Sequence, residues 1–112
     1  MFVAVYWWRV HPGKEAQFEQ AWHRGTELIT RIYGSYGSRL HRERDGRFVG
    51  YAMWPDEARW QAAMAVGMAY DEPETRARFV ESIANSSGDR PAFLMTVIDD
   101  LLVETVGGDP TR

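Results

Sequence analysis

The first stretch of the chain is apolar on both of the faces that a β-strand presents. A strand with one solvated face alternates apolar with polar side chains, because successive side chains point to opposite faces. Residues 2–10 lack this alternation. One face carries Phe2, Ala4, Tyr6 and Trp8, and the other carries Val3, Val5 and Trp7. Both faces of the predicted sheet therefore need cover, and because so short a chain has helices for one face only, we expect a partner subunit on the other.

An amphipathic helix follows the break at residues 11–14. Its apolar residues recur at helical spacing and form one stripe. They are Phe18, Ala21, Trp22, Gly25, Leu28, Ile29 and Ile32. The glycine-containing residues 33–38 end this helix.

A hairpin and a second helical region come next. We expect strands at residues 40–44 and 48–54, joined by a two-residue turn at Asp45-Gly46. Pro55-Asp56-Glu57 is typical of a helix start, since proline suits the first turn and acids suit the helix dipole. This helix is expected to run to about Met68.

The rest of the chain predicts one more helix and one more strand. Helical structure restarts at residues 71–74, carries Phe79, Val80 and Ile83, and stops at residues 85–88. The last strand is expected from Phe93 to about Glu104, with one of Asp99 and Asp100 facing inward unless a bulge turns both outward.

The order of these elements predicts an α+β fold of the ferredoxin-like βαββαβ type. It has a four-stranded antiparallel sheet with helices on one face, and its bare face invites a sheet-to-sheet dimer. Residues 1–105 form a single domain, and residues 106–112 are expected to be a flexible tail.

Composition narrows the class of function. Of the 112 residues, 45% are hydrophobic, which indicates a globular chain. The net charge of −3 argues against nucleic acid or a membrane surface as the partner. Cysteine is absent, so disulfides and thiolate chemistry are excluded. The strand-like start is untypical of a signal peptide or a membrane anchor, so we expect a cytoplasmic protein.

Three segments resemble the antibiotic biosynthesis monooxygenase family of dimeric α+β barrel proteins. They are the strand end at residues 10–14, the Asp45-Gly46 hairpin, and residues 51–58 with a strand-ending tryptophan before a helix start. The resemblance covers roughly residues 2–65. It implies a dimer, and a cofactor-free oxygenase that converts anthrone-type phenols to quinones.

The resemblance also suggests site residues. A strand tryptophan, an aromatic residue six positions later and an asparagine four positions earlier line the pocket of such oxygenases. The matching positions here hold Trp54, Trp60 and Gly50, so the amide is lost. A family arginine falls on Arg76 or Arg78. The haem-degrading branch of the family is rejected, because no histidine follows His41 to bind iron.

The residues themselves leave two interpretations of the tryptophans open. Trp54 and Trp60 form either an aromatic clamp for a flat ligand or ordinary core packing. Gly50 and Ala52 share the strand face of Trp54 and would leave space beside its ring. Trp22 and Tyr36 are further candidate ligand contacts.

The candidate catalytic groups are His11, His41 and Arg76. Histidine titrates near neutral pH and suits acid–base work, although both histidines could equally be surface groups. No histidine pair has metal-ligand spacing, and no glycine-rich nucleotide motif is present, so neither a metal nor a cofactor is expected.

Two functions compete, with a structural role as a third possibility. The first is a cofactor-independent monooxygenase acting on a small flat aromatic or polyketide-like molecule. The alternative is a non-catalytic dimeric protein of the same fold that binds such a molecule. A purely structural dimer would follow if Trp54 and Trp60 packed solidly against Phe18, Trp22 and Met64.

Overall fold

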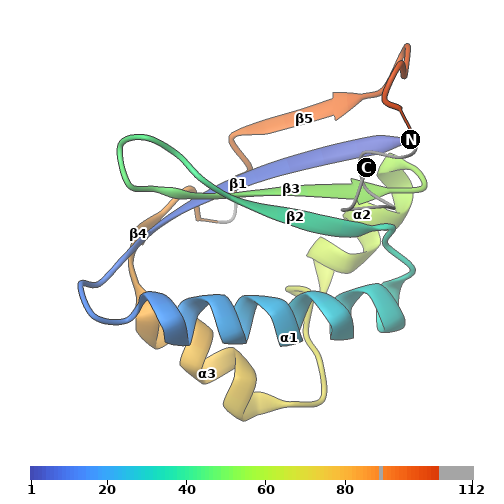
Figure 1. Cartoon of the computed structure of the whole chain (residues 1–112). Coiled ribbons are helices and arrows are strands. Elements are labelled where there is room, and N and C mark those ends of the chain that lie inside the picture. The colour runs from blue at the N-terminus through green and yellow to red at the C-terminus, as the bar shows by residue number, and fades with distance from the viewer. Residues whose placement is uncertain (89, 104–112) are drawn as a thin grey trace.

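The computed structural model describes residues 1–88 and 90–103, which form one antiparallel sheet with three helices (Figure 1). The strands are β1 (Phe2–Val10), β2 (Gly37–Arg42), β3 (Phe48–Trp54), β4 (Ile83–Ser86) and β5 (Phe93–Thr96). The helices are α1 (Glu15–Tyr33), α2 (Glu57–Ala65) and α3 (Pro73–Ser82). Helices α1 and α3 lie side by side across one face of the sheet, as expected for the ferredoxin-like fold.

The sheet has the order β2-β3-β1-β4, and β5 also pairs with β1. β1 is central, because it pairs with β3 along Phe2–Trp8 on one edge. On its other edge β5 pairs with Phe2–Val5, and β4 pairs with Trp8–Val10. Two short strands therefore share the place of the single last strand that the sequence predicts.

The prediction for residues 83–104, a helix end followed by one long strand, is wrong, because β4 and β5 occupy this edge of β1 as two separate strands. Ile83 begins β4 instead of continuing the helix, because the backbone turns extended there and pairs with Val10. β5 ends at Thr96, so Asp99 and Asp100 lie outside any strand and both are exposed. Glu104 and the expected tail lie outside the described residues.

Helix α1 follows its predicted stripe except at one end. Phe18, Ala21 and Leu28 are buried, but Ile32 is 42% exposed near the end of the helix. Gly34 then takes a left-handed conformation and donates its N–H to the Thr30 carbonyl, which ends the helix as predicted.

The hairpin between β2 and β3 is confirmed, but its turn is longer than two residues. Glu43 and Arg47 close it with a backbone hydrogen bond of 2.8 Å, and Gly46 adopts a φ of 95°. β2 accordingly begins and ends earlier than predicted, while β3 has the predicted bounds.

Ion pairs connect α1 to the segment before α3. Arg24 contacts Glu72 at 2.5 Å, and Arg31 contacts Asp71 at 3.3 Å. Asp56 caps α2 by accepting from the Arg59 backbone N–H at 2.8 Å. None of the helices in the described part of the chain combines the length and the apolar character needed to span a membrane.

The Arg24–Glu72 pair predicts a component of acid sensitivity. Hydrogen bonds from Arg24 and Thr75 hold the pKa of Glu72 below its ordinary value. A lowered carboxyl pKa stabilises the fold above the ordinary value of about 4.5, and this contribution is lost as the pH falls through the folded-state pKa. We expect the melting temperature of the Glu72→Gln variant to fall less than that of the unmodified protein as the pH is lowered from 5, as measured by thermal melting.

Glu74→Gln is the matched control, since Glu74 begins the same helix and makes no side-chain hydrogen bond to a described residue. It should keep the acid sensitivity of the unmodified protein. Equal acid profiles for the Glu72 variant and the unmodified protein would contradict the role of this pair.

Candidate functional site

A cavity of about 720 Å³ lies between the helix-facing side of the sheet and the helices. Its size falls within the range of small-molecule sites. Most of its wall is apolar, and the aromatic and charged side chains among the described residues of the wall are Tyr6, Trp8, Trp22, Trp54, Tyr70, Arg76 and Phe79. A flat ring system would find stacking surfaces on several sides of such a space.

The wall of the cavity on the side of the sheet is formed by alternate residues of β1 and β3. Tyr6 and Trp8 of β1 point to the helices, and Tyr6 pairs in register with Gly50 of β3. Ala52 and Trp54 follow Gly50 on the same face, and all three line the cavity. The opposite wall comes from α1, where Trp22 and Gly25 lie on the face toward the sheet.

The space beside Gly50 is partly filled by the ring of Trp8. A Cβ atom built on Gly50 would lie 2.8 Å from Cη2 of Trp8, which is too close for any side chain. Trp8 is itself held by Phe18 and Phe79, with ring centroids 5.4 and 5.7 Å away. The glycine therefore fixes the indole of Trp8 against the floor of the cavity.

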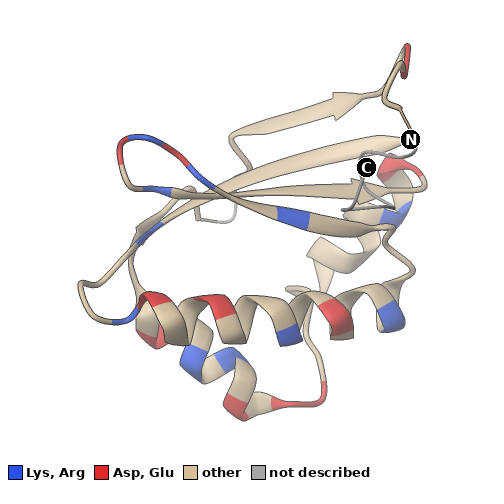
Figure 2. Cartoon of the chain, viewed as in Figure 1, with Lys and Arg blue, Asp and Glu red and all other residues tan. Residues whose placement is uncertain are grey.

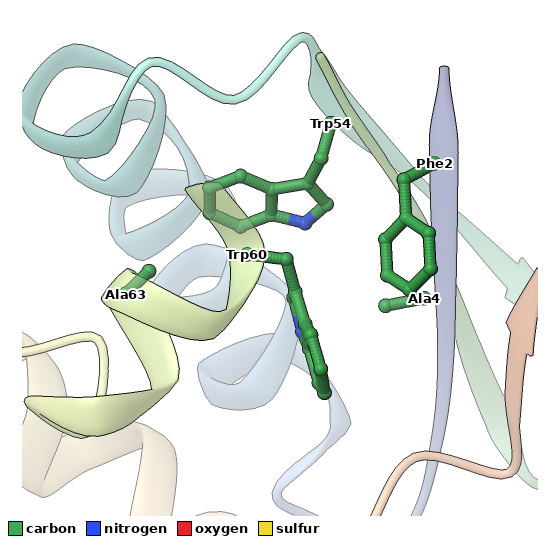
Figure 3. Packing of buried hydrophobic residues seen from close by; sticks show 5 residues of the cluster. All are labelled: Phe2, Ala4, Trp54, Trp60 and Ala63. Atoms are coloured by element: carbon green, nitrogen blue, oxygen red, sulfur yellow. The ribbon is translucent and has the colours of Figure 1, made fainter. Parts of the chain in front are cut away.

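Trp54 and Trp60 belong to the hydrophobic core (Figure 3), and of the two only Trp54 lines the cavity. Trp54 is 1% exposed and Trp60 8% exposed, and the ring of Trp60 lies 5.6 Å from that of Phe2. Among the described residues, Nε1 of Trp54 has no hydrogen-bond partner. Because Trp60 does not line the cavity, the two rings do not form a clamp around it.

Arg76 is the charged group of the cavity. Its Nη2 donates to the Met68 carbonyl at 2.6 Å, and its guanidinium lies 4.5 Å from the ring centroid of Tyr70. Burial raises the pKa of the Tyr70 hydroxyl, although the positive charge of Arg76 opposes that change. Arg78, the other candidate for the family arginine, is exposed and does not line the cavity.

The structure brings four of the expected site residues together and leaves four apart. Trp22, Gly50, Trp54 and Arg76 line the cavity. His11 and His41 are exposed at strand ends and do not reach it, and Nδ1 of His41 lies 3.2 Å from the Val49 carbonyl. Tyr36 is 63% exposed outside the cavity, and Trp60 is buried behind it.

Sequence reasoning missed the contributions of Tyr6, Trp8 and Tyr70. A signal existed for Tyr6 and Trp8, because alternation along β1 assigns them to one face with Phe2 and Ala4. No local signal identifies Tyr70, which reaches the cavity from the segment between α2 and α3. Within residues 1–88 and 90–103, no group of three metal-ligating side chains gathers at one place.

The fold and the site together define the class of protein: a small α+β protein with a split βαβ sheet and an aromatic cavity between that sheet and its helices. The model of the antibiotic biosynthesis monooxygenase family matches residues 1–67, more than half of the chain. The protein belongs to this family. No curated protein matches the sequence.

Solved structures of similar shape include two oxygenases of Streptomyces. SnoaB of Streptomyces nogalater, a cofactor-independent oxygenase, is 22% identical, with 89% of this chain and 95% of that chain covered and a TM-score of 0.64. The ActVA-Orf6 monooxygenase of Streptomyces coelicolor, solved with nanaomycin D, is 23% identical, with 91% of both chains covered and a TM-score of 0.62.

The same shape occurs under another family name. A NIPSNAP domain protein of Burkholderia xenovorans is 18% identical, with 87% of this chain and 94% of that chain covered and a TM-score of 0.61. At such identities the likeness shows the fold alone, so any activity has to be argued from the residues of this chain.

The packing of Gly50 predicts opposite effects for two glycine substitutions. Gly50→Ala forces a methyl group into the wedged ring of Trp8 and should lower stability by about 1–3 kcal/mol. Gly25→Ala is the matched control, because its Cβ would meet only the side chain of Tyr70, with the hydroxyl at 3.0 Å. That contact can relax, and alanine favours a helix over glycine by about 1 kcal/mol.

Urea unfolding of both variants measures the difference. We expect a lower midpoint for Gly50→Ala and an unchanged or higher midpoint for Gly25→Ala. A Gly50→Ala protein as stable as the unmodified chain would show that Trp8 is free to move, contrary to the packing described above.

Proposed function

We propose that the protein is a cofactor-independent monooxygenase that oxidises a small, flat aromatic or polyketide-like molecule with molecular oxygen. The observation that carries the proposal is the cavity of about 720 Å³, walled by the indoles of Trp8, Trp22 and Trp54 and by one arginine. Family membership and the shape shared with a cofactor-independent oxygenase support it.

In this reaction the protein has to orient the substrate and stabilise its negative charge. An anthrone-type substrate loses a proton from the carbon between its aryl rings to water and becomes a delocalised carbanion. The carbanion passes one electron to oxygen, the two radicals combine, and loss of water leaves a quinone: anthrone plus O₂ gives anthraquinone plus H₂O. The indoles would hold the rings, and Arg76 would stabilise the negative charge that develops on the substrate oxygen.

A non-catalytic binding protein is the second candidate, and one feature of the cavity favours it. Among the described residues that line the cavity there is no histidine, aspartate or glutamate. A substrate with a less acidic C–H bond would find no base there. The same walls would then bind a flat molecule without turnover.

Two neighbouring arginines of α3 give a sharp test of the monooxygenase. Arg76→Gln removes the positive charge from the cavity and should lower kcat/KM for anthrone about 100-fold. Arg78→Gln removes an exposed charge from the same helix and should leave kcat/KM unchanged. The assay follows quinone absorbance in air, with an anaerobic reaction as the blank.

The outcomes separate the two candidates. Oxygen-dependent turnover that Arg76→Gln loses would support the monooxygenase. Saturable quenching of tryptophan fluorescence without turnover would favour the binding protein. Turnover of equal rate in both variants would contradict the assignment of Arg76.

We further propose that two copies associate through the sheet face opposite the helices. Val3, Val5 and Trp7 point to this face, and register pairing places Met95 beside Val3 and Phe93 beside Val5. β3 and β5 carry no charged residue (Figure 2). The C-terminal segment adds four exposed apolar side chains, namely Ile98, Leu101, Leu102 and Val103. Val3 and Val5 are themselves buried, so the exposed apolar surface that favours association consists of Phe93, Met95 and these C-terminal side chains.

The dimer predicts a mass of twice 12.9 kDa by light scattering after gel filtration. Phe93→Asp should weaken the dimer, because it puts a charge among apolar side chains on this face. Ile32→Asp, which alters a similarly exposed apolar residue on α1, should not. A monomeric unmodified protein at micromolar concentration would rule out the association.

A further inference from the structure

We propose that Tyr6 binds an oxygen atom of the ligand by donating a hydrogen bond from its phenol, and that Trp60 is the positioning residue for that phenol. This inference rests on the proposed function, because it assumes that the cavity holds a flat aromatic molecule. It goes further by naming a chemical requirement of that molecule: a carbonyl or phenolate oxygen on the edge of the ring system that meets β1.

The direction of one hydrogen bond sets the direction of the next. Nε1 of Trp60 lies 2.8 Å from the hydroxyl of Tyr6. An indole nitrogen can only donate, so the hydroxyl of Tyr6 must accept and its own proton must point elsewhere. The buried Trp60, which does not line the cavity, thereby aims the phenol of a residue that does.

The proton of Tyr6 has only a poor partner at present. Among the described residues, the hydroxyl donates to Sδ of Met64 at 3.7 Å. A thioether sulfur is a weak acceptor. An oxygen atom entering the cavity, whose wall includes both Tyr6 and Met64, would be a better one.

Two serine hydroxyl groups of the cavity wall already have an oxygen atom within hydrogen-bond distance. Oγ of Ser38 donates to the Tyr51 carbonyl at 3.0 Å. Oγ of Ser35 lies 3.0 Å from the hydroxyl of Thr30 and accepts from the Gly37 backbone N–H at 3.2 Å. Ser38 thus already donates to an oxygen atom, whereas the hydroxyl of Tyr6 donates only to a sulfur.

The surroundings of Tyr6 keep it a donor. Burial raises the pKa of its phenol, and the hydrogen bond from Trp60 opposes that change only in part. The group stays protonated at neutral pH, so it acts as a hydrogen-bond donor and not as a base. Its register partner Gly50 has no side chain, so β3 offers no competing polar group there.

Binding of two ligands that differ only in oxygen tests the inference. Anthraquinone and anthracene are both flat and tricyclic, and only the former carries carbonyl oxygens. Their affinities are measured by quenching of tryptophan fluorescence. Tyr6→Phe should weaken anthraquinone binding roughly 3- to 10-fold, the cost of one neutral hydrogen bond, and leave anthracene binding unchanged.

Two more variants separate positioning from packing. Tyr36→Phe, the same change at an exposed tyrosine outside the cavity, should alter neither affinity. Trp60→Phe keeps an aromatic ring in the core but removes the N–H, so it should weaken anthraquinone binding and raise the pKa of one tyrosine in a spectrophotometric titration. A change in packing alone would weaken both ligands alike.

The results distinguish this inference from the proposed function. If the unmodified protein binds anthraquinone and Tyr6→Phe binds it equally well, the role of Tyr6 is overturned while the binding site stands. If the unmodified protein binds neither ligand, the proposed function fails and the role of Tyr6 fails with it. Selective loss of anthraquinone binding supports both.

Discussion

The central strand has to be covered on both sides, and most of the architecture follows from this requirement. β1 places Phe2, Ala4, Tyr6 and Trp8 toward the helices and three large apolar side chains toward the other face. Burial of these surfaces is the main favourable term available to so small a domain. The helices provide one cover directly. On the other face Val3 is only 1% exposed, while Phe93 and Met95 of β5 stay exposed and would be covered by the association proposed above.

Core and candidate site are built from the same strands. Trp54 is among the most buried side chains of the chain, yet its ring also forms part of the cavity wall. Trp60 packs against Phe2 and at the same time bonds to the phenol of Tyr6. Rigid packing of this kind holds a ligand-binding wall in place, because each ring is supported from behind. Truncating either tryptophan would therefore disturb folding and binding together.

Sequence reasoning succeeds where periodicity is strong and fails where tertiary pairing decides. The apolar run of β1 and the stripe of α1 predict both elements well, and β3 has its predicted bounds. Ile83 fits a helical pattern, but pairing with β1 makes it a strand residue. The histidines illustrate a different limit, since residue type suggests acid–base work while only the fold shows that His11 and His41 are exposed and do not line the cavity.

The contact between Gly50 and Trp8 restricts how this site can change over evolutionary time. A polar side chain at position 50, such as the asparagine of the oxygenases that the chain resembles, would overlap the indole of Trp8. A single substitution toward that amide would therefore be selected against until Trp8 had become smaller. The two positions form an epistatic pair, in which the order of mutations matters. With tryptophan at position 8, position 50 offers a ligand no side-chain group, which agrees with the proposed contact through Tyr6 of β1.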